Sequence, residues 1–147
     1  MIDDVEARER AASITRLVLC SGKVYVDVVS SPHRAAARDV AICRVEQLYP
    51  FPGTSLRELL SGYPALASVA WLQEEPENMG AWDFIRPNLE EVIAGRCPLR
   101  YIGRVRNSSP AEGSAAWHHL NQTALVDQVF SNDRQSPDVP LVLSKPA

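Results

Sequence analysis

The sequence lacks several features that would place it in a specialised class of protein. Basic residues are not in excess, because 15 Lys and Arg stand against 18 Asp and Glu and the formal net charge is −3. Nucleic acids are bound through a clear basic excess, so a dedicated nucleic-acid-binding protein is excluded. No apolar run approaches the ~18 residues of a membrane-spanning helix. The opening MIDDVEARER also has no apolar core of the kind found in signal peptides.

Cysteine is scarce, and the three thiols of Cys20, Cys43 and Cys97 form no C-x-x-C pair. Cys20 and Cys43 fall within apolar, strand-like runs, where a thiol serves as a small core residue. This spacing favours reduced structural thiols in a cytoplasmic protein over a disulfide framework or a zinc site.

The chain does have the composition of an ordinary globular domain. Its 147 residues are 46% apolar and 22% charged, which is enough to bury one core. There is no internal repeat and no low-complexity tract. We expect a loose lead-in or short helix over residues 1–15, one domain over residues 16–130, and an irregular tail over residues 131–147, which contains three prolines.

Short apolar runs alternate with amphipathic segments along the domain. Strands are predicted at residues 17–20, 40–45, 68–73 and 99–102, and helices at residues 23–29, 55–61, 81–94 and 114–130. Continuous apolar strands fit burial on both faces of a sheet. The alternation predicts an α/β domain in which helices cover both faces of a mainly parallel sheet.

Individual residues refine these boundaries. Thr54 is a suitable N-cap for the second helix, and Pro32 is expected to end the first helix early. Pro87 should kink or split the third helix. The last helix is expected to bury a stripe made of Trp117, Leu120, Ala124, Leu125 and Val129. Residues 139–143 of the tail could add an edge strand.

Polar residues follow each predicted strand. These are Ser21-Gly22-Lys23, Glu46-Gln47, Glu74-Glu75 and Gly103-Arg104. Ligands of open α/β sheets bind outside the carboxyl ends of the strands. The sequence therefore predicts a binding or partner site at this edge.

The decapeptide from Gln73 to Trp82, Q-E-E-P-E-N-M-G-A-W, is the most distinctive of these strand ends. Glu74 and Glu75 could act as a general acid and base, but neighbouring strand residues point to opposite faces. A structural or interface ion pair is the preferred interpretation. Asn78 and Gly80 suit a tight turn and a helix cap.

Basic residues at the same edge are candidates for an anion site. Ser21-Gly22-Lys23 resembles part of a phosphate-binding loop but lacks its other glycines and spacing. Arg104 and Arg106 are better placed for bidentate contacts with phosphate or carboxylate. The alternative is that these arginines pair with a carboxylate of the chain itself, from Glu46, Glu74 or Glu75.

No catalytic constellation is complete in this chain. His118 and His119 are adjacent and would point about 100° apart on a helix, so they do not form a metal site on their own. There is no G-x-S-x-G motif and no Cys-His grouping with an orienting residue.

Several motifs nevertheless occur in a recognisable order. They are R-V-E-Q-L-Y-P-F-P at residues 44–52, Q-E-E-P-E-N-M-G-A-W at residues 73–82, Y-I-G-R at residues 101–104, S-P-A at residues 109–111, and His118. Residues 2–130 closely resemble the C-terminal domain of the decarboxylating component of 2-oxoglutarate dehydrogenase. The Ile2-Asp3-Asp4 start resembles the sequence that precedes this domain in the family, which suggests a truncated piece.

The resemblance implies a transketolase C-terminal-like three-layer domain, with one strand that can run in reverse. In the family this domain builds the homodimer and supports the catalytic domains. Thiamine diphosphate and magnesium bind in the two preceding domains, which carry a G-D-G…N signature absent from this chain. No catalytic, cofactor or metal residue is therefore assigned here, and the chain alone is expected to be inactive.

The parent activity implied by the resemblance is oxidative decarboxylation of 2-oxoglutarate, or a close 2-oxo acid, in the tricarboxylic acid cycle. The succinyl group passes to a lipoyl-bearing succinyltransferase partner. The interface candidates of this chain are Tyr49, Phe51, Glu74, Glu75, Asn78, Trp82 and His118. We expect exposed aromatic patches at Tyr49, Phe51 and Trp82.

A different class of function remains open beside this one. The chain could be a stand-alone regulatory or interaction module that binds a nucleotide or another anion at Lys23, Arg104 and Arg106. Some relatives bind adenine nucleotides or acetyl-coenzyme A near this domain. The chain also departs from the family pattern, because Val26 replaces a usual aromatic residue and Glu112 replaces a small one.

Overall fold

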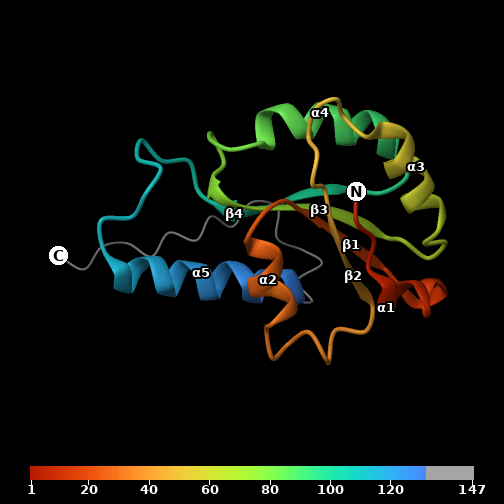
Figure 1. Ribbon diagram of the computed structural model, residues 1–147, viewed down its shortest axis with the longest axis horizontal. Helices are drawn as coiled ribbons and strands as arrows, with labels where there is room; N and C mark the ends of the chain where they lie inside the picture. Colours follow the sequence, from red (N-terminus) through yellow and green to blue (C-terminus); the bar gives the residue numbers. More distant parts are fainter. Residues whose placement is uncertain (132–147) are drawn as a thin grey trace.

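A single four-stranded parallel sheet forms the centre of the protein in the computed structural model, which describes residues 1–131 (Figure 1). The strands are β1 (Arg16–Cys20), β2 (Val40–Arg44), β3 (Ser68–Pro76) and β4 (Leu99–Arg104), in the order β2-β1-β3-β4. Every pairing among them is parallel. The reversed strand allowed by the family resemblance is not among these four. The predicted tail and its edge strand at residues 139–143 lie outside the described residues.

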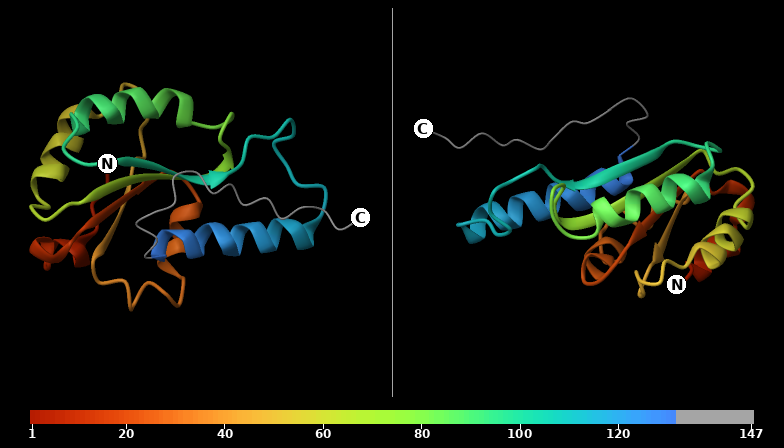
Figure 2. Two further views of the ribbon diagram at one scale, coloured as in Figure 1. Left: turned by 180° about the vertical axis from the view of Figure 1, so that it is seen from behind. Right: turned by 90° about the horizontal axis from the view of Figure 1, so that it is seen from above.

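Helices cover both faces of the sheet, which confirms the predicted three-layer α/β architecture (Figures 1 and 2). They are α1 (Val5–Arg8), α2 (Val24–Val29), α3 (Gly53–Ser61), α4 (Trp82–Ile93) and α5 (Ala115–Phe130), with a 3-10 turn at Ala11–Ser13. The helices α3 and α4 lie on one side, and α2 and α5 on the other. None of the helices in this described region is long and apolar enough to cross a membrane.

Successive side chains of each strand point to opposite faces of the sheet and pack in two separate hydrophobic cores. In β1, Leu17 and Leu19 pack in the core beneath α3 and α4, whereas Val18 and Cys20 pack beneath α2 and α5. Because helices cover both faces of the sheet, the strand residues that point to either face have to be apolar. This explains why the strands appear in the sequence as continuous apolar runs.

The N-terminal residues are bound to the outer edge of the sheet. Ile2 forms an antiparallel bridge with Arg44 of β2. Asp4 caps α1 and also accepts hydrogen bonds from the Ile42 amide at 2.9 Å and from Arg34 at 2.7 Å. The segment is therefore an ordered edge with a short helix at Val5–Arg8.

Asp3 completes this attachment. Its carboxylate accepts hydrogen bonds from Tyr63, Cys43 and Arg8. Burial raises the pKa of the Asp3 carboxyl, but these hydrogen bonds outweigh it and the net pKa lies below its ordinary value.

Some helix boundaries differ from the prediction. Thr54 lies inside α3, whose N-cap position is Pro52 and has no side-chain cap, so the predicted cap is wrong. Pro87 lies within α4, which is one continuous helix, so of the two predicted effects, a kink or a split, the split is wrong. The early end of α2, before Pro32, is confirmed.

The predicted buried stripe of α5 is correct only toward the end of the helix. Leu125 and Val129 are buried, but Leu120 is 52% exposed and Trp117 is half-buried. The first turns of α5 extend past the strands, so they have no sheet to pack against (Figure 1). Periodicity identifies the apolar face of a helix, but it does not show how far the partner surface extends.

Candidate functional site

The strand β3 continues through the glutamates that were expected to follow it. It runs to Pro76, with a register irregularity against β4 between Leu72 and Pro76. Glu74 and Glu75 thus lie on opposite faces. Glu74 Oε1 accepts a hydrogen bond from Gln122 of α5 at 2.8 Å, whereas Glu75 is exposed. The predicted strand end is wrong, and the two carboxylates do not converge on one substrate.

Gln73 organises the turn between β3 and α4 from inside. Its side chain is buried, and its Nε2 donates hydrogen bonds to the carbonyls of Pro76 at 3.2 Å and Met79 at 2.8 Å. Its Oε1 accepts a hydrogen bond from the Trp71 indole at 3.0 Å. Sequence reasoning missed this role, although a lone amide at the end of a buried apolar run was the available signal.

The remaining residues of the decapeptide also serve the turn itself. Gly80 has a φ of +67°, and a Cβ there would lie 3.0 Å from Cβ of Glu75. Asn78 exchanges two hydrogen bonds of 2.9 Å with the backbone of Asn107 in the loop before α5. The N-cap position of α4 is Ala81, so Asn78 is a bridge between two loops rather than a helix cap.

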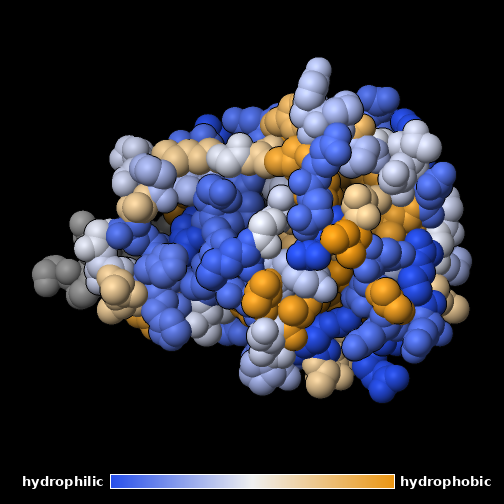
Figure 3. All heavy atoms as spheres, in the orientation of Figure 1, coloured by the Kyte–Doolittle hydropathy of each residue, from blue (hydrophilic) through white to orange (hydrophobic). Residues whose placement is uncertain are grey.

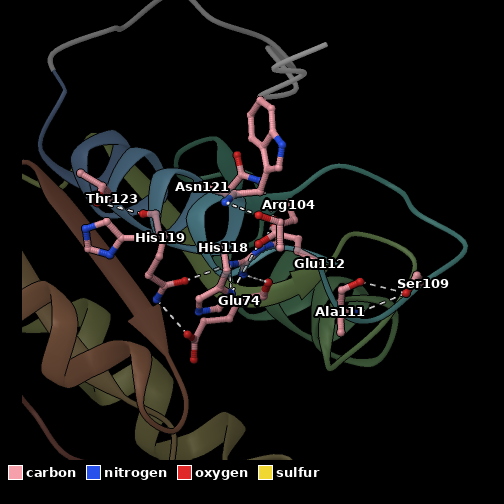
Figure 4. Close-up of polar contacts among 12 residues, drawn as sticks. Glu74, Arg104, Ser109, Ala111, Glu112, His118, His119, Asn121 and Thr123 are labelled. Carbon is pink, nitrogen blue, oxygen red and sulfur yellow. Dashed lines mark hydrogen bonds and ion pairs between the residues drawn. The ribbon is translucent and has the colours of Figure 1, made fainter. Parts of the chain in front are cut away.

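Arg104 lies at the centre of a polar network at the carboxyl ends of β3 and β4 (Figure 4). Its Nε donates to Glu112 Oε1 at 3.1 Å, and its Nη1 donates to the carbonyl of Glu74. Its Nη2 donates to Gln122 Oε1 at 3.1 Å and lies 3.4 Å from Nδ1 of His118. All three guanidinium nitrogens are therefore engaged, as the ion-pair alternative predicted, but the partner carboxylate is Glu112.

Lys23 is neutralised in the same way. Its Nζ lies 2.5 Å from Asp27 and 3.9 Å from Glu74. Gln122 Nε2 joins the two carboxylates through hydrogen bonds of 2.8 Å to each. Burial raises the pKa of Asp27, but the hydrogen bonds from Lys23 and Gln122 outweigh it and the net pKa is lowered.

Arg106 is exposed in the loop after β4 and makes no side-chain hydrogen bond or ion pair with residues 1–131. Lys23 and Arg104 are paired, so Arg106 is the one predicted anion ligand whose charged group has no partner within that range. The structure thus brings Lys23, Glu74, Arg104 and His118 together but not as a cluster of free cations. Figure 3 shows the hydrophilic surface that results on the side where the strands end.

A hollow of about 660 Å³ opens beside this network. It lies between the end of β4, the loop of residues 105–114 and the first turns of α5. Its walls include apolar groups from Val105, Pro110 and Trp117 and polar groups from Glu112 and Asn121. Burial raises the pKa of Glu112, but hydrogen bonds from Asn121 and Arg104 outweigh it, so the net pKa is lowered and the carboxyl is ionised.

The aromatic interface candidates have different environments. Tyr49 is 80% exposed and packs against Phe84, with a ring-centroid distance of 6.4 Å. Phe51 is half-buried against the core beneath α3 and α4. Trp82 is only 6% exposed and packs on Tyr101, so the expectation of an exposed aromatic is wrong there.

Comparison with known proteins gives a consistent match. The 2-oxoglutarate dehydrogenase C-terminal family matches residues 1–130. The 2-oxoglutarate dehydrogenase E1 component of Exiguobacterium sp. (strain ATCC BAA-1283 / AT1b) is 41% identical over 127 residues, which is 85% of this chain. That of Bacillus subtilis (strain 168) is 46% identical over 117 residues, or 77% of the chain. The matched regions are 13% and 12% of these two relatives, so this chain spans a small part of their length.

Proposed function

This chain belongs to the 2-oxoglutarate dehydrogenase C-terminal family, and from that membership we propose that it is the C-terminal structural and dimerisation domain of an E1 component. The observation that carries the proposal is the extent of the family match, which covers all but one of the described residues. The complete enzyme would decarboxylate 2-oxoglutarate and pass the succinyl group to a lipoyl-bearing partner protein.

The geometry of the strand ends supports a scaffolding role. Polar side chains of the most distinctive motif, residues 73–82, bind backbone groups of the chain itself. Gln73 donates a hydrogen bond within its own turn, and Asn78 donates one to a neighbouring loop. Arg104 and Lys23 are paired with groups of this chain. Polar groups that are hydrogen-bonded to one another hold the shape of the surface that they form.

The residues of this chain do not fit a thiamine diphosphate and magnesium site. The sequence has no G-D-G motif. Among residues 1–131, no group of three His, Cys, Asp or Glu side chains could hold a metal ion. The cofactor and its chemistry would therefore belong to the preceding part of the enzyme.

The proposal is tested by restoring activity to a shortened enzyme. An E1 component, such as that of Bacillus subtilis, is prepared without the segment that matches this chain. Decarboxylation of 2-oxoglutarate is then measured with thiamine diphosphate and magnesium. Neither protein alone should be active, and mixing them should restore activity together with formation of a stable complex.

A folded chain that neither binds the shortened enzyme nor restores activity would contradict the scaffold role. The anion-binding module would then be the better interpretation. Arg106, exposed and without a partner in the described region, would be the first residue to replace in that case.

A further inference from the structure

The turn that follows β2 leaves a stretch of backbone without partners. The amide of Val45 still donates to the Cys20 carbonyl at 2.8 Å, but the backbone amides of residues 46–49 donate no hydrogen bond within residues 1–131. Most of this stretch is exposed. Backbone groups left open at the outer edge of a sheet are available to another chain segment.

The stretch ends at an aromatic pair that faces solvent. Tyr49 is 80% exposed and Phe84, at the start of α4, is 41% exposed, and their ring centroids lie 6.4 Å apart. Gln47 donates to the Tyr49 carbonyl at 3.2 Å, which holds the backbone of the turn. Asn88 donates to the Phe84 carbonyl at 2.7 Å. A preorganised apolar surface of this kind costs little entropy to cover.

The N-terminal residues fix the direction from which a preceding segment would arrive. Ile2 exchanges two backbone hydrogen bonds with Arg44, of 2.8 and 2.9 Å, in antiparallel pairing. Residues before Ile2 are therefore directed along the residues that follow Arg44. The N-terminus accordingly lies beside the segment that runs from β2 to α3 (Figures 1 and 2). At ~3.3 Å per residue, about five residues before Ile2 would span the stretch from Arg44 to Tyr49.

Two carboxylates hold this direction in place. Asp3 accepts a hydrogen bond from the Tyr63 hydroxyl at 2.8 Å, and Asp4 accepts one from the Ile42 amide of β2 at 2.9 Å. Arg34 adds an ion pair of 2.7 Å to Asp4, and both of these side chains are largely buried. A preceding segment would therefore approach residues 46–49 along a fixed path.

We propose that the segment immediately preceding Met1 in the complete enzyme runs along residues 46–49 and covers the aromatic pair of Tyr49 and Phe84. The occupant rests on the proposed function, in which this chain is the C-terminal domain of an E1 component. The matched region is only 13% of the Exiguobacterium relative, so ample chain lies outside it. The segment would place an apolar side chain against the two rings, because aromatic residues are enriched in the buried centres of interfaces.

The test compares how fast tetranitromethane nitrates Tyr49 in the free chain and in an extended chain. The extension is the segment that immediately precedes the matched region in the Bacillus subtilis component, and its control has the same residues in scrambled order. Mass spectrometry of peptides separates Tyr49 from the other tyrosines. The native extension should slow nitration of Tyr49 at least about tenfold, because a covered ring reacts only when the segment opens locally. Half-buried Tyr25 on α2 should react at the same rate in all three proteins.

Ile2 provides a variant that changes the direction of entry but not the aromatic surface. In the extended chain, Ile2→Pro removes the amide that donates to Arg44 and should restore fast nitration of Tyr49. Ile2→Val keeps the amide and should leave the ring protected. Ile2 is 44% exposed, so both variants should fold, as circular dichroism would verify. The comparison of native and scrambled extensions does not depend on either variant.

Three results would overturn the proposal. The first is equal nitration of Tyr49 with the native and scrambled extensions. The second is protection that survives Ile2→Pro in a folded protein. The third is slower nitration of Tyr49 in the free chain at raised concentration, since a second copy of the chain would then cover the pair.

Mixing the free chain with the shortened enzyme separates this inference from the proposed function. Restored activity while Tyr49 reacts as fast as in the free chain would refute the covered surface and leave the scaffold role intact. Protection of Tyr49 by the native extension, without restored activity on mixing, would support the covered surface and count against the scaffold role.

Discussion

Gln73 shows how one residue can explain a motif that suggests chemistry. Its amide replaces solvent for the carbonyls of Pro76 and Met79 and for the Trp71 indole. A buried polar group of this kind is stabilising only while all its partners are in place. The conspicuous polarity of the decapeptide is therefore largely a requirement of the turn.

Replacing Gln73 with leucine should expose this dependence. Leucine has a similar size but leaves the Met79 carbonyl and the Trp71 indole N–H without the partner that Gln73 supplies, whereas the Pro76 carbonyl keeps the Met79 amide. Each unsatisfied group costs about 1–3 kcal/mol. We expect the free energy of unfolding, measured by urea denaturation, to fall by about 3 kcal/mol. Gln128→Leu on α5 is the control and should stay within about 0.5 kcal/mol of the parent. A similar small change for Gln73→Leu would show that the amide does not support the turn.

At the scale of elements, the strands and helices were predictable because burial imposes a regular pattern. Continuous apolar runs identified all four strands, and periodicity identified α3, α4 and α5. The end of β3 was not predictable, because Glu74 and Glu75 break the apolar run, yet pairing with β4 resumes beyond them at Pro76 after a register irregularity. A ladder is held by backbone hydrogen bonds, which the side chains do not report.

The candidate site was likewise predictable only in part. Arg104 was identified as a residue of interest from its position after a strand. Its partner Glu112 lies in an irregular loop and Gln122 on α5, and their meeting depends on how that loop folds. The local periodicity of the sequence does not predict the conformation of an irregular loop. The sequence indicated which edge of the sheet carries the polar network, but not which charged residues pair with one another there.

The two turns that flank α4 allow the cost of backbone strain to be separated from crowding. Gly80 precedes the helix and Gly95 follows it, and both have positive φ angles, +67° and +72°. A Cβ at Gly95 would meet nothing within 4 Å, whereas one at Gly80 would lie 3.0 Å from Glu75 Cβ and 3.1 Å from Gln73 Nε2. The pair therefore differs mainly in steric contact.

Alanine at these two positions should have unequal effects on thermal and urea unfolding. Gly95→Ala should cost about 1 kcal/mol, the penalty for a left-handed backbone in an L-residue. Gly80→Ala should cost about 3 kcal/mol, because overpacking adds to that penalty. Equal losses for the two variants would mean that the turn before α4 relaxes freely, contrary to the hydrogen-bonded arrangement around Gln73.

The whole molecule presents two surfaces with different characters. The carboxyl edge of the sheet is hydrophilic, and Lys23 and Arg104 at this edge are paired with carboxylates of the chain itself. The turn after β2 instead exposes Tyr49, which packs on Phe84 at the start of α4. Solvent-exposed aromatic pairs are uncommon on monomers and frequent at the centres of interfaces. A scaffold domain would use both, the aromatic pair for affinity and the polar edge for orientation.

Replacing both Tyr49 and Phe84 with serine tests this division on the mixed enzyme. Both side chains are exposed, 80% and 41%, so the fold should be retained, as circular dichroism would verify. Loss of a central aromatic anchor costs about 2 kcal/mol or more, so restored decarboxylase activity at limiting chain concentration should fall at least about tenfold. Val26→Ser, which removes another exposed apolar side chain on α2, should have no effect. Undiminished activity in the double variant would place the interface elsewhere.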